Sequence, residues 1–216
     1  DALPISVAPF RFTSPAQSEP DKMGEHEVNA ECEARSAENA RAVFLDRDGV
    51  ISRSIVRDGL PFAPTTVSDF EILPEALAAC RRLKQEGFVL IVVTNQPEVG
   101  RGTMKREAVE EMHTKMLIEL PIDRVEVCYH PGHGMSDCDC RKPKPGLLLT
   151  AAKVLNIDLA RSWLVGDRWR DIDCGFAAGC RTVFIDRDYA ESLKREPDFR
   201  AHDLAEAAEL ILANSK

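Results

Sequence analysis

Short runs of apolar residues recur along the chain from residue 42 onward, separated by longer segments that mix apolar and polar positions. The runs are AVFL (42–45), FVLIVV (88–93), VEVCY (125–129), SWLV (162–165) and TVFI (182–185). They are rich in β-branched and aromatic residues, which favour strands. Because they are apolar at nearly every position instead of at alternate positions, they are typical of strands covered on both faces, as in a parallel sheet.

The segments between and after these runs show the periodicity of amphipathic helices. The predicted helices cover residues 74–87, 103–120, 146–156, 171–179 and 203–213. The first begins at Pro74 and ends at Gly87, which are typical boundary residues. In the second, Met104, Met112 and Met116 recur at multiples of four positions, which predicts that they pack this helix against the core.

Strands that alternate with helices predict one fold class. Right-handed crossovers between parallel strands place helices on both sides of the sheet, so we expect a three-layer, doubly wound α/β domain over residues 41–216. No insertion in this range is long enough to form a large cap domain. In such sheets, ligands bind at the carboxyl ends of the strands, near the point where the strand order reverses.

Composition divides the chain at residue 40. Residues 1–40 contain eight acidic residues, three basic residues and four prolines, and this composition predicts a disordered tail. The whole chain has a formal charge of −8 and no apolar run of the roughly 20 residues that cross a bilayer. These features argue against nucleic-acid and membrane partners and favour small-molecule or protein partners. The odd number of cysteines, seven, favours a cytoplasmic protein over a disulfide framework, and we expect a monomer.

Polar residues follow the predicted strands at the edge where ligands are expected. They are Asp46 and Asp48 after the first strand, Thr94 and Asn95 after the second, Lys142 before the third helix, and Asp167 and Asp171 after the fourth strand. Crowded carboxylates repel one another unless a cation lies among them, and Mg²⁺ favours carboxylate, water and phosphate oxygens. A hydroxyl and a lysine are donors for the oxygens of a phosphoryl group. The pattern therefore indicates phosphoryl transfer, with Asp46 placed to attack phosphorus and Asp48 to carry a proton.

Four motifs in this order resemble those of the haloacid dehalogenase superfamily of phosphatases. FLDRDGVI carries Asp46 and Asp48, VVTN carries Thr94, KPKP carries Lys142, and VGDRWRDI carries Asp167. The resemblance covers about residues 42–190. It implies that Asp46 is the nucleophile and that Asp48 is the general acid and base. It also implies that Thr94 and Lys142 stabilise the phosphate.

The same resemblance implies a magnesium site. Its ligands would be Asp46, Asp167 and the backbone carbonyl of Asp48, with Asp171 as a further candidate. An aspartate at position 48 is typical of the phosphatases of the superfamily, whereas other branches place another residue there.

A second cluster of metal-binding residue types lies in CYHPGHGMSDCDC, residues 128–140. Cys128 and His130 form one pair, Cys138 and Cys140 form another, and seven residues separate the pairs. Three thiolates and an imidazole make a closed, tetrahedral zinc site and select zinc over magnesium. We therefore expect a structural Zn²⁺ that fixes this loop. His133 is a competing ligand, and an ordinary polar loop is the alternative interpretation.

The zinc loop is followed directly by Arg141 and the motif lysine, and this arrangement resembles the subgroup that holds the heptose bisphosphate and histidinol phosphate phosphatases. In the heptose enzymes the arginine before the motif lysine contacts substrate, which implies that role for Arg141. We expect a sugar bisphosphate of the heptose 1,7-bisphosphate type as substrate, hydrolysed through an aspartyl phosphate. Guanidinium groups suit phosphate. The expected substrate-binding residues are Asn95, Arg53, Arg57, Arg101 and Arg141.

Two other functions remain open at this point. The chain could hydrolyse histidinol phosphate or another small monoester of the same subgroup. It could also be a catalytically silent binding module held together by zinc, although the complete set of motif residues argues against this.

A few polar residues lie outside this scheme. We expect Arg47, between the two aspartates of the first motif, to contact substrate. His113 and His202 are interpreted as solvated or helix-face histidines. Asp186, Arg187 and Asp188 repeat the Asp-Arg-Asp pattern after the fifth strand. No glycine follows them, so this segment is predicted to be a loop and not a second site.

Overall fold

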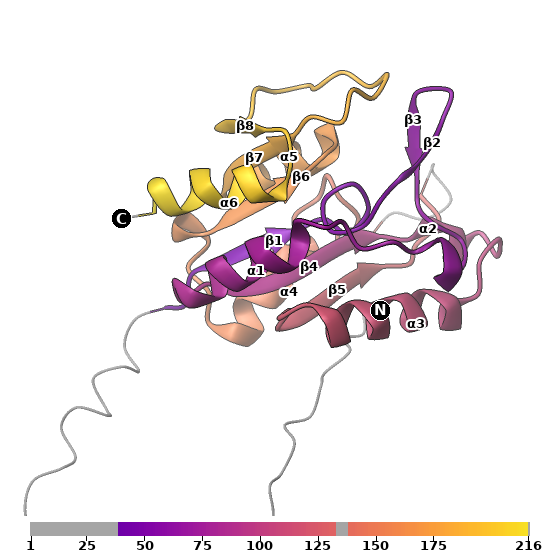
Figure 1. Ribbon diagram of the computed structural model, residues 1–216, viewed down its shortest axis with the longest axis horizontal. Helices are drawn as coiled ribbons and strands as arrows, with labels where there is room; N and C mark the ends of the chain where they lie inside the picture. The colour runs from indigo at the N-terminus through magenta and orange to yellow at the C-terminus, as the bar shows by residue number, and fades with distance from the viewer. Residues whose placement is uncertain (1–38, 133–137, 216) are drawn as a thin grey trace, which may run out of the picture.

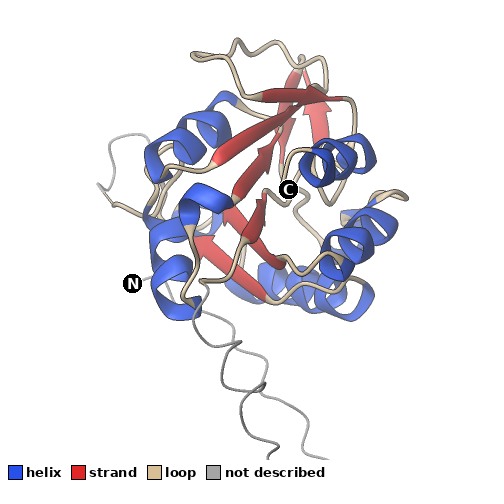
Figure 2. Ribbon diagram, turned by 90° about the vertical axis from the view of Figure 1, so that its left-hand side faces the viewer, coloured by secondary structure: helices blue, strands red, loops and turns tan. Residues whose placement is uncertain are grey.

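The computed structural model describes residues 39–132 and 138–215, and Figures 1 and 2 show its ribbon. Its strands are β1 (Ala42–Leu45), β2 (Ile55–Arg57), β3 (Leu60–Phe62), β4 (Val89–Asn95), β5 (Arg124–Cys128), β6 (Trp163–Gly166), β7 (Arg181–Ile185) and β8 (Phe199–Ala201). Its helices are α1 (Ala76–Gln85), α2 (Pro97–Gly100), α3 (Arg106–Glu119), α4 (Gly146–Leu155), α5 (Trp169–Ala178) and α6 (Leu204–Ala213), with the 3₁₀ turns η2 (Val67–Asp69) and η3 (Leu159–Arg161). His133 and residues 1–38 of the predicted tail lie outside the described residues.

The described structure begins before residue 41, the predicted start of the domain. The Ala40 amide donates to the Asn156 carbonyl over 3.0 Å, and the Ala40 carbonyl accepts from the Asp158 amide over 2.8 Å. These bonds tie Ala40 to the turn after α4, and the domain boundary stays a prediction.

The main sheet has six parallel strands in the order β5-β4-β1-β6-β7-β8. From β1 the chain first builds β4 and β5 on one side and then β6, β7 and β8 on the other. The strand order therefore reverses between β1 and β6, and this is the place where an open parallel sheet binds ligands. The predicted doubly wound α/β fold is confirmed.

Helices cover both faces of this sheet (Figure 2). Along β1, Val43 and Leu45 point into a core that includes residues of α1, α3 and α6. Ala42 and Phe44 point to the other side, where they meet residues of α4 and α5. All four side chains are fully buried, which explains why this run is apolar at every position.

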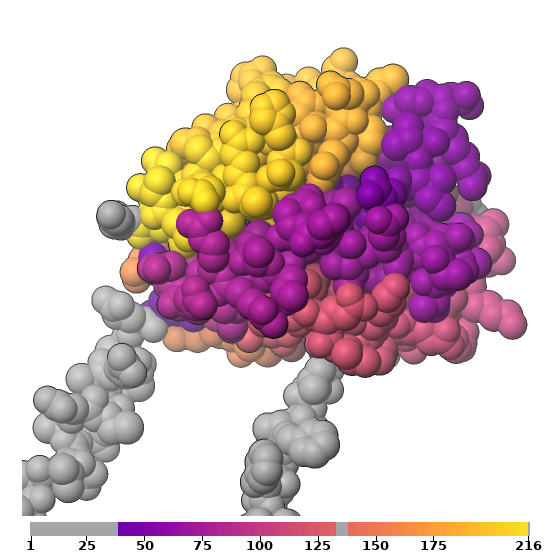
Figure 3. All heavy atoms as spheres, viewed as in Figure 1, coloured from indigo at the N-terminus to yellow at the C-terminus, as the bar shows by residue number. Residues whose placement is uncertain are grey.

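The antiparallel hairpin β2–β3 was not predicted. Its turn places Asp58 at φ 50° and Gly59 at φ 73°, and positive φ at both central positions is typical of a tight hairpin turn with the sequence Asp-Gly. The Asp-Gly dipeptide is the sequence feature from which this hairpin could have been predicted. In Figure 3 the purple hairpin abuts the orange segment after β7, where the Ala190 amide donates to the Gly59 carbonyl over 2.8 Å.

Smaller differences concern the helices and a strand. α3 begins at Arg106, so Met104 precedes it, although its side chain is buried as predicted. β8, a three-residue strand at the sheet edge, was also not predicted. Across the described ranges, no helix combines the length and apolar character needed to cross a membrane, and no cap domain is inserted.

Two adjacent leucines of α4 test how the helix packs. Leu148 is fully buried against the sheet, whereas Leu149 is 48% exposed. Leu148→Ala should lower the free energy of unfolding by about 2–5 kcal/mol, because it leaves a cavity. Leu149→Ala, the matched control, should lower it by less than about 1 kcal/mol. Urea unfolding followed by circular dichroism measures both values, and equal losses would contradict this packing.

Candidate functional site

The turn after β1 brings Asp46 and Asp48 to the point where the strand order reverses. The Asp46 amide donates to the Val165 carbonyl of β6 over 3.0 Å, which joins the end of β1 to the neighbouring strand. Gly49 follows at φ 90°, and a Cβ there would lie 1.7 Å from Oδ2 of Asp167. Only glycine therefore allows the turn to pass so close to the carboxylate at the end of β6.

Three buried carboxylates meet at this edge. One carboxylate oxygen from each of Asp46, Asp167 and Asp171 lies within 4.8 Å of the others. Burial raises the pKa of Asp46 to about 6, although Lys142 opposes the shift. Burial, followed by the Asp46 and Asp171 charges, also raises the pKa of Asp167. The nearby Tyr189 hydroxyl and the Lys142 charge lower this pKa, but among the described residues neither makes a hydrogen bond of good geometry with the Asp167 carboxylate. Crowded, buried carboxylate oxygens of this kind fit a hard divalent cation such as Mg²⁺.

The positively charged side chain of Lys142 pairs with this carboxylate cluster. Its Nζ lies 2.8 Å from Oδ1 of Asp46 and 2.7 Å from Oδ1 of Asp171, and it donates to the Val93 carbonyl over 2.7 Å. Burial alone would lower the pKa of this lysine, but the Asp171 and Asp46 carboxylates raise it above its usual value. Asp171, a candidate magnesium ligand from sequence, is thus paired with Lys142.

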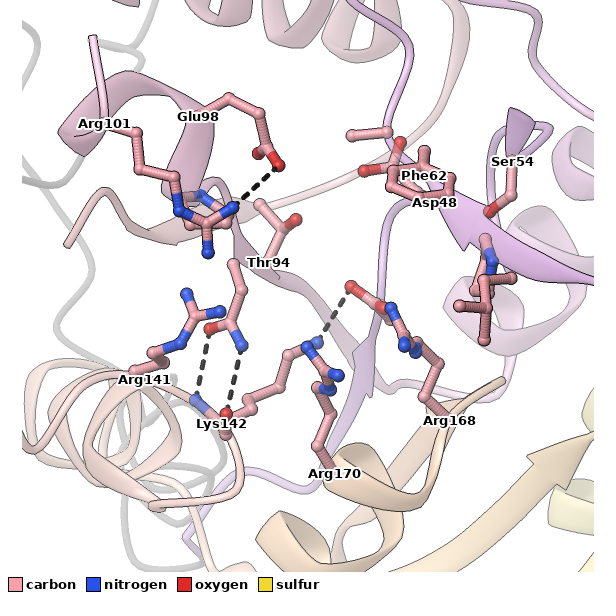
Figure 4. Close-up of a pocket in the computed structure, with 16 residues that line it drawn as sticks. Asp48, Ser54, Phe62, Thr94, Glu98, Arg101, Arg141, Lys142, Arg168 and Arg170 are labelled. Carbon is pink, nitrogen blue, oxygen red and sulfur yellow. Dashed lines mark hydrogen bonds and ion pairs between the residues drawn. The ribbon is translucent and has the colours of Figure 1, made fainter. Parts of the chain in front are cut away.

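Asn95 holds the backbone of Lys142. Its side-chain Nδ2 donates to the Lys142 carbonyl over 3.1 Å, and its Oδ1 accepts from the Lys142 amide over 3.1 Å (Figure 4). Both ends of the amide are therefore engaged with the loop that carries the lysine. Thr94 lines the cavity beside Asn95, and its hydroxyl accepts a hydrogen bond from Gln96 Nε2 over 2.9 Å.

A cavity of about 370 Å³ opens over these residues. Figure 4 shows Arg101 and Arg141 on one side of it, and Ser54 and Phe62 from the hairpin region on the other. The lining residues include the predicted Asp46, Asp48, Thr94, Asn95, Arg101, Arg141 and Lys142. The predicted catalytic and phosphate-contacting side chains are thus brought together.

Two of the predicted substrate arginines do not line this cavity. Arg53 is exposed and pairs with Glu71, with 2.9 Å between its Nε and Oε2 of the glutamate. The Arg57 guanidinium lies 5.6 Å from the centre of the Phe62 ring. Both residues are on or beside the hairpin, but neither side chain is among those that face the cavity.

Two arginines that sequence reasoning passed over line the cavity in their place, Arg168 and Arg170. They stand at the start of α5, one and three residues after Asp167, so their position in the fourth motif was the available signal. Glu191 holds Arg168 through two hydrogen bonds of 2.7 and 2.6 Å. Nε of Arg170 is buried and has no hydrogen-bond partner among the described residues.

One expectation from sequence is wrong, and another holds only in part. Arg47 is fully buried, so it cannot contact substrate; its guanidinium points into the protein and pairs with Asp48 over 2.8 Å. His113 lies on a helix face, as expected, but it is fully buried and not solvated, because this face of α3 packs under the site. Periodicity alone did not separate this histidine from its solvated neighbours.

The second predicted cluster also comes together. Sγ of Cys128 lies 3.6 Å from Nδ1 of His130 and 3.8 Å from Sγ of Cys138, and the His130 Nδ1 lies 3.2 Å from Sγ of Cys140. Ligands about 2.3 Å from a tetrahedral zinc are separated by about 3.8 Å, so this geometry fits Zn²⁺. Burial raises the pKa of the Cys128 thiol, and a bound cation would favour the thiolate.

Comparison with known proteins identifies relatives of this chain. A family model described as HAD-hydrolase-like matches residues 139–207. The chain is 36% identical over 161 residues to the D-glycero-beta-D-manno-heptose-1,7-bisphosphate 7-phosphatase of Escherichia coli, which covers 70% of this chain and 81% of the relative. It is 32% identical over 185 residues to the protein of the same name from Pasteurella multocida, which covers 79% of this chain and 96% of the relative.

A solved structure is similar along most of the chain. The D,D-heptose 1,7-bisphosphate phosphatase from B. bronchiseptica, complexed with magnesium and phosphate, has a TM-score of 0.69 and 29% sequence identity, and covers 80% of this chain and 98% of that chain. The resemblance carried by the four motifs is confirmed, and so is the expectation of a phosphatase. This chain belongs to the haloacid dehalogenase-like phosphatases, in the family of the heptose-bisphosphate 7-phosphatases.

Proposed function

We propose that this phosphatase removes one phosphate from a sugar bisphosphate of the heptose 1,7-bisphosphate type, at the carbon distal to the anomeric centre. The observation that carries the proposal is the cavity, in which the Asp46 and Lys142 pair faces a space lined by four arginines, Arg101, Arg141, Arg168 and Arg170. One phosphate would react at Asp46, and the arginines would hold the second anionic group. The names of the relatives support this substrate class.

The reaction divides between two aspartates. A carboxylate oxygen of Asp46 attacks phosphorus, and the bond from phosphorus to the leaving oxygen breaks as Asp48 donates a proton to that oxygen. The product is an aspartyl phosphate and a free hydroxyl. Asp48, now ionised, takes a proton from the water that attacks the phosphoryl group, which releases inorganic phosphate and restores Asp46. Thr94 and Lys142 are placed to donate to the equatorial oxygens.

The magnesium ion would be held by Asp46, Asp167 and the backbone carbonyl of Asp48. Bound there, it would neutralise charge on the phosphoryl group and on the carboxylates around it. The similar structure with magnesium and phosphate supports this assignment.

We also propose that Cys128, His130, Cys138 and Cys140 hold a structural zinc ion. Cys140 is directly followed by Arg141 and Lys142, so the loop that the ion fixes is also the loop that delivers two cavity cations. Zinc would act on catalysis only through the placement of these residues. A monomeric state and a cytoplasmic location stay predictions from the sequence.

A substrate panel tests the proposed activity. Phosphate release under Mg²⁺ should be faster from heptose 1,7-bisphosphate than from histidinol phosphate or p-nitrophenyl phosphate, because only the bisphosphate offers a second phosphate to the arginines. Phosphorus NMR of the product should find the remaining phosphate at the anomeric carbon. Preference for histidinol phosphate would favour the related monoesterase, and no turnover of any of the three would favour a silent binding module.

Asp46→Asn tests the nucleophile. The amide cannot form the aspartyl phosphate, so turnover should fall by at least about a thousandfold, while the unfolding transition stays cooperative. Asp186→Asn is the matched control, because Asp186 begins the second Asp-Arg-Asp sequence but is exposed at the end of β7. It should keep wild-type turnover. Residual activity near wild type in Asp46→Asn would reject the assignment.

Metal analysis tests the zinc site. Purified protein should contain about one zinc per chain, and Cys138→Ala should lower both the zinc content and the melting temperature. Cys180→Ala removes a buried thiol outside the cluster and should keep the zinc. Protein that is free of zinc yet fully stable and active would contradict the structural role.

A further inference from the structure

Arg47 and His113 form a buried polar pair that the proposed mechanism leaves without a function. Arg47 reaches from the turn after β1, and His113 from α3, and both side chains are fully buried. NH1 of Arg47 lies 3.1 Å from Nε2 of His113. The Arg47 guanidinium also lies 5.4 Å from the centre of the Phe70 ring. Buried polar groups of this kind need a reason to be present, because an apolar pair would cost less to bury.

The contact with Arg47 fixes the state of the histidine. A guanidinium can only donate, so Nε2 of His113 must accept, and its ring is neutral with the hydrogen on Nδ1. Burial, followed by the charge of Arg47, lowers the pKa of His113 to about 3, which agrees with a neutral ring. Nδ1 has no partner among the described residues. His113 therefore serves as an acceptor for Arg47 while its own donor goes unpaired.

The rest of the guanidinium is directed at Asp48. Nε of Arg47 donates to Oδ1 over 3.0 Å, and NH2 donates to Oδ2 over 2.8 Å. Ser52 Oγ donates to Oδ1 over 3.0 Å, and Gln96 Nε2 donates to Oδ2 over 3.0 Å. A carboxylate held at both oxygens by one planar fork cannot rotate without breaking two bonds at once. Of its three partners, only Arg47 contacts both oxygens. Ser52 and Gln96 each bind one oxygen, and one of them must give way when that oxygen carries the proton for the leaving group.

We infer that Arg47, held in place by His113, is a positioning residue that fixes the orientation of Asp48 toward the leaving-group oxygen in the cavity. The inference rests on the proposed role of Asp48 as general acid. His113 acts at one remove, because it does not line the cavity and its acceptor nitrogen meets Arg47. Its acceptor nitrogen fixes the plane of the Arg47 guanidinium, and the guanidinium in turn fixes the orientation of the Asp48 carboxylate.

This role affects substrates unequally. An alkyl phosphate, such as a sugar phosphate, must receive a proton on its leaving oxygen as the bond to phosphorus breaks, and Asp48 has to face that oxygen. p-Nitrophenolate leaves without a proton, so the orientation of Asp48 matters little for its release. Loss of the clamp should therefore slow enzyme phosphorylation by an alkyl phosphate more than by p-nitrophenyl phosphate. A purely structural role would slow both equally.

Single-turnover measurements with enzyme in excess isolate the phosphorylation step. The substrates are p-nitrophenyl phosphate and the alkyl phosphate that wild type hydrolyses fastest in the panel above. His113→Leu removes the acceptor for Arg47 and should slow release of the alkyl leaving group about tenfold relative to p-nitrophenolate. His113→Gln offers an amide oxygen as acceptor and should recover most of this loss. Arg47→Lys, which cannot bridge both carboxylate oxygens, should show a larger relative loss.

Met116→Leu is the matched control, because Met116 is fully buried on α3 and contacts the apolar core. It should leave the ratio of the two rates unchanged. Equal slowing of both substrates by His113→Leu, or no slowing of either, would overturn the inference. If Arg47→Lys does not fold, the two His113 variants decide the question. Wild-type protein that releases phosphate from neither substrate would overturn the proposed function as well, whereas active wild type with an unchanged ratio in His113→Leu overturns this inference alone.

Discussion

The site depends on one buried cation, the Lys142 ammonium. It lies between the Asp46 and Asp171 carboxylates and donates to the Val93 carbonyl of β4. Removing an ammonium group from water is costly unless several acceptors replace the solvent. Here the acceptors are Asp46 directly after β1, the Val93 carbonyl within β4 and Asp171 in the first turn of α5. The lysine therefore joins β1, β4 and the helix that follows β6, so the sheet and the charge cluster depend on each other.

The loop that carries Lys142 has no regular structure of its own, and neighbouring groups fix it. Asn95 holds the lysine backbone through both its amide and its carbonyl. The Cys and His cluster lies immediately before it in the chain, with Cys140 two residues from the lysine. A side chain fixed at its backbone before substrate arrives loses little entropy when it binds phosphate. The Cys and His cluster and Asn95 thus have the same consequence, and both lie in motifs that the sequence shows.

The sequence predicts this site better than its surroundings for a physical reason. Strand ends, motif aspartates and the Cys and His pairs each occupy fixed local positions, so their convergence follows from the parallel sheet. The arginines depend on where flexible side chains point: Arg53 turns to Glu71, whereas Arg170, at the start of α5, turns to the cavity. The burial of His113 could not be predicted from the sequence. A polar side chain is buried in a core only when a partner distant in the sequence, here Arg47, offsets the cost of removing it from water.

The aspartates are divided into two electrostatic environments, and this division suits their two tasks. Asp46, Asp167 and Asp171 share one lysine, which leaves two negative charges for a divalent cation to balance. Asp48 is separate, because Arg47 balances it and three side chains bind its oxygens. The nucleophile therefore lies among the carboxylates and the lysine, while the side chain of the proton carrier lies beside a guanidinium. Asp46 and Asp48 are separated by one residue, and they can act differently because the Asp-Arg-Asp turn places their side chains in these two environments.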